Sequence, residues 1–202
     1  MNSYREEKQE IINSKKIYLE WCNYEKEKYL IHGMIDYYLK LLYGNEYAVI
    51  WKFQHRLRKT EYFFNTNKTI RYHLSNIILN RYRNRYGLHI GLNVCGKGLK
   101  IMHLGSILIN GNVKIGQDVS IHINTSFVAK GVNNGVPKIS DGCVIGVGAT
   151  IVGDVFIARN ISIGANSIVC KNIYEENVAI AGNPAKKVSE NGRIKWKNNN
   201  NE

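Results

Sequence analysis

The chain has 202 residues, of which 44% are hydrophobic and 22% charged, and its formal net charge is +12. This balance is typical of a globular protein and argues against disorder, and no apolar stretch reaches the roughly 18 residues needed to span a bilayer. The N-terminal stretch MNSYREEKQEIINSKK is too charged for a signal peptide, and the four cysteines (Cys22, Cys95, Cys143 and Cys170) show no metal-ligand spacing. We therefore expect a cytoplasmic protein with reduced thiols and no bound metal.

The positive charge is concentrated between Glu46 and Lys100. Eleven Lys or Arg residues fall there against Glu46 and Glu61, which gives +9 over about a quarter of the chain. Such a patch attracts a phosphate-bearing cofactor, an acidic glycan, nucleic acid or anionic lipids at the inner face of a membrane. Nucleic acid is not expected, because no base-reading module is visible. A solvated helix face would explain the same charge.

Residues 4–85 are predicted to be helical. The segment YLIHGMIDYYLKLLYG repeats apolar residues at intervals of three and four and stops at Gly44. Two further candidate helices follow, NEYAVIWKFQHRLRKTEYFFN and TIRYHLSNIILNRYRNRYG, the second ending at Gly87. Proline is absent from this half, which favours continuous helices.

After Gly87 the helical period disappears and a period of six takes its place. One column of apolar residues holds Ile109, Ile115, Ile121, Phe127, Ile139, Ile145, Ile151, Ile157, Ile163 and Val169. A second column lies two residues earlier and holds Val113, Val119, Cys143, Ala149, Val155 and Ile161. A helix cannot keep residues six apart on one face, and a simple strand alternates every two.

Short strands that turn a corner every six residues satisfy this pattern, and three of them close a triangular coil of about 18 residues. We expect a mixed fold: an α-helical region (1–86), a parallel β-helix of hexapeptide repeats (87–189) and a polar tail (190–202). The helical region would cap one end of the stack. Residues 130–137 interrupt the column and are predicted to form a loop expelled from a coil, where function often resides.

Several segments of the β-helical half resemble the hexapeptide-repeat acyltransferases, in the branch of serine acetyltransferases and polysaccharide O-acetyltransferases. They are GKGLKIMHLGSILINGNVKIG, PKISDGCVIGVGATIVG, IGANSIV and AIAGNPAKKV, and the resemblance covers about residues 87–189. It implies a left-handed β-helix, assembly as a homotrimer and acetyl-CoA as the acetyl donor.

His103, in IMHLG, matches the catalytic histidine of that family. A hydroxyl attacks a thioester only when a base removes its proton, and the pKa of histidine suits this task. The resemblance therefore implies direct transfer with His103 as general base, without an acyl-enzyme. Because His103 precedes Ile121 by 18 residues, an interior, hydrogen-bonded histidine is the structural alternative.

The match departs from serine acetyltransferases at the groups that orient the histidine and bind the amino acid. They have an Asp fifteen residues before the histidine and another directly before it, where this chain has Leu88 and Met102. They carry an Arg-His pair where this chain has Gly135 and Val136. Such losses weaken recognition of a zwitterion. We therefore expect a sugar hydroxyl as acceptor, in surface-polysaccharide biosynthesis.

Further site residues follow from stacking and from the resemblance. His122 lies 19 residues after His103, so one coil brings them close, and it is a candidate to stabilise the oxyanion or bind the acceptor. Asn110 and Asn124 are candidates for substrate binding or simple corner residues. The resemblance implies a CoA groove between subunits, with contacts expected at Ala129, Val147, Ala165, Lys186 and Lys187.

Two alternatives to sugar O-acetylation stay open. A serine O-acetyltransferase of cysteine biosynthesis would need a re-engineered recognition loop. A catalytically inactive β-helical scaffold would explain the missing Asp at position 88. An amine acceptor also needs a base and is compatible with the same residues.

Overall fold

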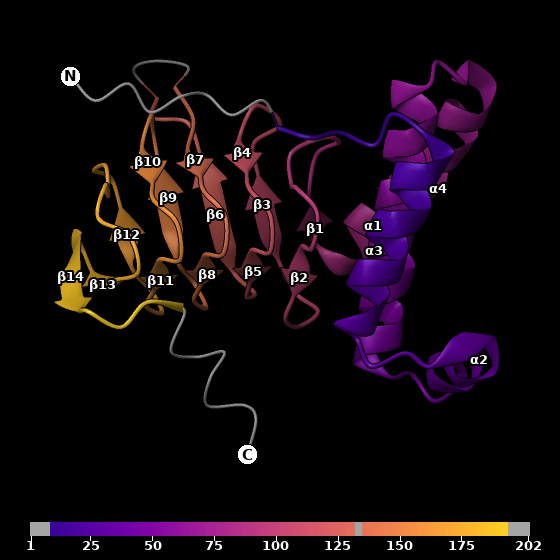
Figure 1. Cartoon of the computed structure of the whole chain (residues 1–202), viewed down its shortest axis with the longest axis horizontal. Coiled ribbons are helices and arrows are strands. Elements are labelled where there is room, and N and C mark those ends of the chain that lie inside the picture. The colour runs from indigo at the N-terminus through magenta and orange to yellow at the C-terminus, as the bar shows by residue number, and fades with distance from the viewer. Residues whose placement is uncertain (1–8, 132–134, 194–202) are drawn as a thin grey trace.

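The described residues form four helices, which stand at one end of a stack of short strands (Figure 1). The computed structural model describes residues 9–131 and 135–193. The helices are α1 (Lys15–Glu27), α2 (Gly33–Leu42), α3 (Glu46–Asn65) and α4 (Thr69–Tyr86). Residues 194–202, most of the expected polar tail, and 132–134, in the expected loop, lie outside the described residues.

The helical region is more interrupted than the sequence predicts. Residues 9–14 form no helix, and the Gln9 side chain instead donates to two backbone carbonyls of the β-helix. The helix expected from Tyr29 begins at Gly33. The Tyr29 hydroxyl donates to Gln54 and accepts from the Ile101 N–H, at 2.6 and 2.9 Å, and Leu30 then adopts a left-handed φ of 52°. These long-range bonds outweigh the local helical period.

The strands form three sheets, one for each face of a prism. The five-stranded sheet contains β1 (Leu88–His89), β3 (Ile107–Ile109), β6 (Thr125–Val128), β9 (Thr150–Val152) and β12 (Ile168–Val169). The three-stranded sheet contains β4 (Lys114–Ile115), β7 (Lys138–Ile139) and β10 (Phe156–Ile157). The six-stranded sheet contains β2 (Lys100–Ile101), β5 (Ser120–Ile121), β8 (Val144–Ile145), β11 (Ser162–Ile163), β13 (Ala179–Gly182) and β14 (Ala185–Ser189).

Successive coils stack in parallel register, which confirms the prediction from the six-residue period. Ile145 pairs with Ile163, and Ile151 pairs with Val169, each eighteen residues later. Every residue of both predicted columns is buried, with at most 5% exposure. Buried apolar area of this kind stabilises the fold by about 25 cal/mol per Å².

The regular stack is interrupted in the middle by one longer coil and changes direction at its last strand. Phe127 pairs with Ile151, a step of 24 residues, so the segment between β6 and β7 adds six residues to one coil. At the far end, β14 runs antiparallel to β13, whereas all other strand pairs in the described chain are parallel.

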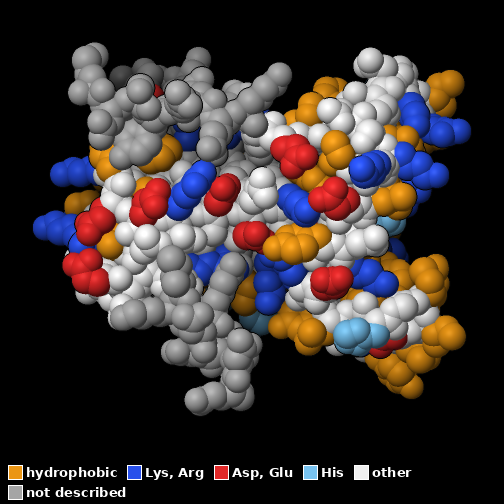
Figure 2. All heavy atoms as spheres, viewed as in Figure 1, with side chains coloured by type: hydrophobic (Ala, Val, Ile, Leu, Met, Phe, Trp, Pro, Cys, Tyr) orange, Lys and Arg blue, Asp and Glu red, His pale blue; other side chains and the backbone are white. Residues whose placement is uncertain are grey.

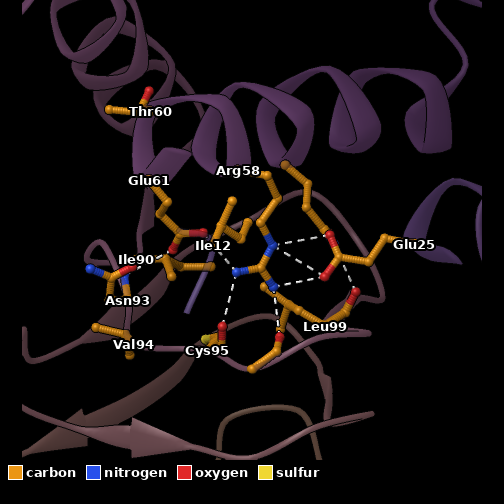
Figure 3. Close-up of polar contacts among 12 residues, drawn as sticks. Ile12, Glu25, Arg58, Thr60, Glu61, Ile90, Asn93, Val94, Cys95 and Leu99 are labelled. Carbon is orange, nitrogen blue, oxygen red and sulfur yellow. Dashed lines mark hydrogen bonds and ion pairs between the residues drawn. The ribbon is translucent and has the colours of Figure 1, made fainter. Parts of the chain in front are cut away.

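A buried ion cluster fastens the helices to the first coil (Figure 3). Arg58 of α3 donates to both carboxylate oxygens of Glu25 in α1 and to Glu61 one turn further along α3. Its remaining donors reach the carbonyl oxygens of Cys95 and Gly96 at 2.9 and 2.7 Å. Both ion pairs are buried. The guanidinium thus uses all five of its N–H groups on three segments of the chain.

Burial and the charges of neighbouring groups shift the pKa values of Arg58 and Glu61. Desolvation opposes the charge on Arg58, but the carboxylates of Glu25 and Glu61 outweigh it and raise the pKa of the guanidinium well above its usual value. Desolvation raises the pKa of Glu61, against the pull of Arg58 and of the Asn93 N–H. The Arg58 cation therefore offsets the energetic cost of burying the carboxylates of Glu25 and Glu61.

The outer helix α2 contributes little to this packing. None of its residues is buried, and its exposed apolar side chains are Met34, Ile35, Tyr38, Leu39 and Leu42. Figure 2 shows hydrophobic side chains gathered at this corner of the molecule, at lower right. None of the helices in the described part of the chain combines the length and apolarity that crossing a bilayer demands.

Arg58→Met is expected to lower the free energy of unfolding by about 3–5 kcal/mol, because it leaves two buried carboxyl groups without their cation. Denaturant unfolding of the full chain measures this. Arg71→Met, at an exposed position of α4, is the matched control and should change stability by less than about 0.5 kcal/mol. Equal effects of the two substitutions would contradict the role given to the cluster.

Candidate functional site

One edge of the β-helix gathers five of the predicted site residues. This histidine edge is the corner between the six-stranded and five-stranded sheets, and it comprises residues 102–106, 122–124, 146–149 and 164–167. It carries His103 on one coil, His122 and Asn124 on the next, and Val147 and Ala165 on the two coils that follow. Backbone bonds link the corners, as from the Asn166 N–H to the Val147 carbonyl at 2.7 Å.

His103 lies outside the prism. Ile101 pairs with Ile121, so this coil contains twenty residues rather than eighteen, and Ile101 takes the inward position. The side chain of His103 is half exposed, at 50%. The alternative of an interior histidine is therefore wrong, because the longer coil shifts the phase by two residues.

Glu46, at the start of α3, supplies a carboxylate to His103. Its Oε2 lies 3.1 Å from Nδ1 of His103, and its Oε1 accepts from the Leu104 N–H at 2.6 Å. From the sequence, Glu46 is only one negative charge within the basic stretch and is not predicted as a site residue. No local motif signals the contact, because 57 residues separate the two side chains.

His122 stands one coil further along the same edge. Its ring centroid lies 6.2 Å from that of His103, as the 19-residue spacing predicts. Partial burial, together with His103 and Lys100, lowers the pKa of His122 below its usual value, so the ring is neutral at pH 7. Its Nδ1 is buried and has no hydrogen-bond partner among the described residues.

The residues expected to contact CoA do not all share this edge. Val147 and Ala165 are exposed and stack directly on the histidine edge. Ala129 follows β6 and lies at the next corner, between the five-stranded and three-stranded sheets. Lys186 and Lys187 lie on β14; Lys187 is ion-paired with two glutamates, whereas Lys186 makes no ion pair within the described chain.

The two asparagine candidates occupy corner positions. Asn110 follows β3, away from the histidine edge, and its side chain accepts from the Asn112 N–H at 3.0 Å. Asn124 is on the histidine edge, has a left-handed φ of 60° and donates its N–H to the Ser106 carbonyl. Asparagine tolerates this conformation well, so Asn124 has a structural role whatever else it contacts.

The basic stretch is not one continuous surface. Arg58 is fully buried, and Arg83 donates to the Ile90 carbonyl at 2.5 and 3.0 Å. At least these two of the eleven cations therefore hold the helices to the first coil rather than face a partner.

No family model matches the sequence. The serine acetyltransferase of Buchnera aphidicola subsp. Acyrthosiphon pisum is 33% identical over 159 residues, which cover 77% of this chain and 55% of that protein. The serine acetyltransferase of Helicobacter pylori is 28% identical over 152 residues, covering 74% of this chain and 84% of that one. The chain thus spans about half the length of the Buchnera relative, and 30% of a probable rice serine acetyltransferase.

Solved structures agree with the sequence relatives. The serine acetyltransferase of Neisseria gonorrhoeae has a TM-score of 0.66 at 22% identity, covering 94% of this chain and 73% of that one. A serine acetyltransferase in complex with CoA has a TM-score of 0.57 at 26% identity, covering 69% of this chain and 57% of that one. These findings confirm the expected fold, an α-helical region before a left-handed parallel β-helix, and the resemblance to serine acetyltransferase-like acyltransferases.

The expectation of a sugar hydroxyl in surface-polysaccharide biosynthesis is wrong. It rested on missing residues at Leu88, Met102, Gly135 and Val136, whereas the relatives found by sequence and by structure are named serine acetyltransferases. A carboxylate for the histidine need not come from the aligned positions. Glu46 brings one to His103 from another element.

His122 is expected to titrate below the usual histidine value of about 6.5, and His103→Ala should raise its pKa by exposing the ring and by removing a neighbour that disfavours its protonation. NMR titration of the histidine ring signals measures this. His73→Ala, at an exposed position of α4, is the control and should leave the His122 pKa unchanged. A wild-type His122 that titrates above 6.5 would contradict the electrostatics described.

Proposed function

We propose that this serine acetyltransferase-like protein transfers an acetyl group from acetyl-CoA to the hydroxyl of L-serine. The observation that carries the proposal is the histidine edge: His103, supported by a carboxylate, beside a neutral His122. The names of the relatives support serine as acceptor, and the solved relative that holds CoA supports the donor. Such a reaction belongs in the cytoplasm, where acetyl-CoA is available.

His103 acts as the general base in this proposal. It takes the proton of the serine hydroxyl while the hydroxyl oxygen bonds to the thioester carbon. The tetrahedral intermediate then collapses, the carbon–sulfur bond breaks, and the thiolate of CoA leaves with a proton returned by the imidazolium. Three of the four cysteines are buried, so none of these supplies an accessible nucleophile.

His122 stabilises the negative charge that develops on the carbonyl oxygen. It is neutral at pH 7 and therefore carries one N–H. We place that proton on Nε2, because a buried Nδ1–H without an acceptor is the less tolerated arrangement. A positioned donor of this kind is typically worth a factor of about 10² to 10³ in turnover.

Acetyl-CoA would lie along the histidine edge, with its pantetheine arm over Val147 and Ala165. Both residues are exposed, and their corners stack on the same edge as His103. Ala129 lies at another corner, so it could touch the same molecule only from a neighbouring subunit. A homotrimer with the donor between two prisms is therefore part of the proposal.

The main test is release of CoA by the full chain, followed with a thiol reagent in the presence of acetyl-CoA and L-serine. His103→Ala should lower kcat by about 10² to 10⁴-fold, since it removes the base. His73→Ala is the matched control and should retain wild-type turnover. Binding of acetyl-CoA by calorimetry without any serine-dependent release would overturn serine as the acceptor.

Lys186 is expected to contact the phosphates of the donor, while Lys187 is not, because Glu175 and Glu190 already hold its ammonium group. Lys186→Ala should therefore raise the KM for acetyl-CoA about fivefold, corresponding to roughly 1 kcal/mol for one exposed contact. Lys187→Ala provides the paired comparison at the adjacent position. A larger effect from Lys187→Ala would reverse this assignment.

A further inference from the structure

We propose that Glu46 is the positioning residue that fixes the tautomer and orientation of His103, an inference that rests on the proposed base role of that histidine. The aligned family position for an orienting Asp holds Leu88, which is fully buried and apolar. The carboxylate therefore comes from the helical region and not from the β-helix.

The contact constrains both partners. Oε2 of Glu46 lies 3.1 Å from Nδ1 of His103, while Oε1 accepts from the Leu104 N–H at 2.6 Å. The second bond prevents the carboxylate from rotating away from the ring. An ionised carboxylate only accepts, so the proton of neutral His103 sits on Nδ1 and the lone pair on Nε2. Nε2 is then the nitrogen available to take the serine proton.

The start of α3 keeps this carboxylate in place. Asn45 caps the helix, its side chain accepting from the Ala48 N–H at 3.2 Å, and Glu46 occupies the first turn. A negative charge is favoured there by the helix dipole, by about 0.3–1 kcal/mol.

The body of α3 is anchored to the same coil that carries His103. The Gln54 side chain donates to the Leu99 carbonyl at 2.9 Å, and Arg58 binds the Cys95 and Gly96 carbonyls. These bonds are buried, so the distance between the helix start and the β2 corner is set by rigid contacts. Positioning groups act well only when such supports hold them.

Glu46→Gln is the sharpest substitution, because it keeps the size and the acceptor for Leu104. If the amide oxygen stays on the Leu104 N–H, the amide NH₂ faces Nδ1 and donates to it. The proton of His103 would then move to Nε2, which is the wrong tautomer for a base. An orienting group that presents the wrong hydrogen-bonding character can cost several orders of magnitude in kcat.

Two measurements on the full chain test this. With ¹⁵N-labelled histidine, NMR should show Nδ1 of His103 protonated in the wild type and Nε2 protonated in Glu46→Gln; the signals are assigned by their loss in His103→Gln. In the thiol-release assay, kcat should fall at least about tenfold with the KM for acetyl-CoA within twofold of wild type. Glu27→Gln, at an exposed position of α1, should change neither reading.

The outcomes separate the two proposals. An identical His103 tautomer in the wild type and Glu46→Gln would overturn the positioning role, even in an active enzyme. A tautomer that switches in a chain with no serine-dependent CoA release would support the Glu46 contact and reject the proposed function. A lower kcat with an unchanged tautomer would also reject the positioning role, since lost helix stability alone could produce it.

Discussion

The buried cluster of Arg58, Glu25 and Glu61 is the constraint from which the rest of the architecture follows. It joins α1, α3 and the first coil with charged hydrogen bonds that have no contact with water. Buried ion pairs rarely add net stability compared with apolar packing, but they demand one geometry, because any shift leaves a charge without a partner. The cluster therefore specifies how α3 lies on the β-helix.

Because α3 is a stiff helix, fixing it at Arg58 also fixes the position of Glu46 beside the histidine edge. Arg58 is twelve residues from Glu46 on α3, about three turns. The β-helix contributes the other half of the arrangement, because stacking places His103 and His122 on neighbouring coils. The α-helix thus positions Glu46 and the six-residue repeat positions His103, and these two side chains contact each other.

The features that could be predicted from the sequence are those set by the local spacing of residues. The columns around Ile121 and Ile145 are buried because each coil repeats the one before it. The same spacing offered an interior position as the alternative for His103, and that alternative is wrong because the first coil has two additional residues that the later repeat does not reveal. It also missed Glu46, whose partner lies 57 residues away, and the helix break after Tyr29, which is set by bonds to Gln54 and Ile101.

The antiparallel direction of β14 changes the edge at which the six-stranded sheet ends. A parallel coil with an open last strand presents a row of unpaired N–H and C=O groups, which can template the addition of further chains. The antiparallel pairing of β14 with β13 occupies that row, and β14 carries lysines on its surface. Helices close the opposite end of the stack. On the six-stranded face, an approaching chain would therefore meet the lysine-bearing β14 rather than a parallel strand of the coil.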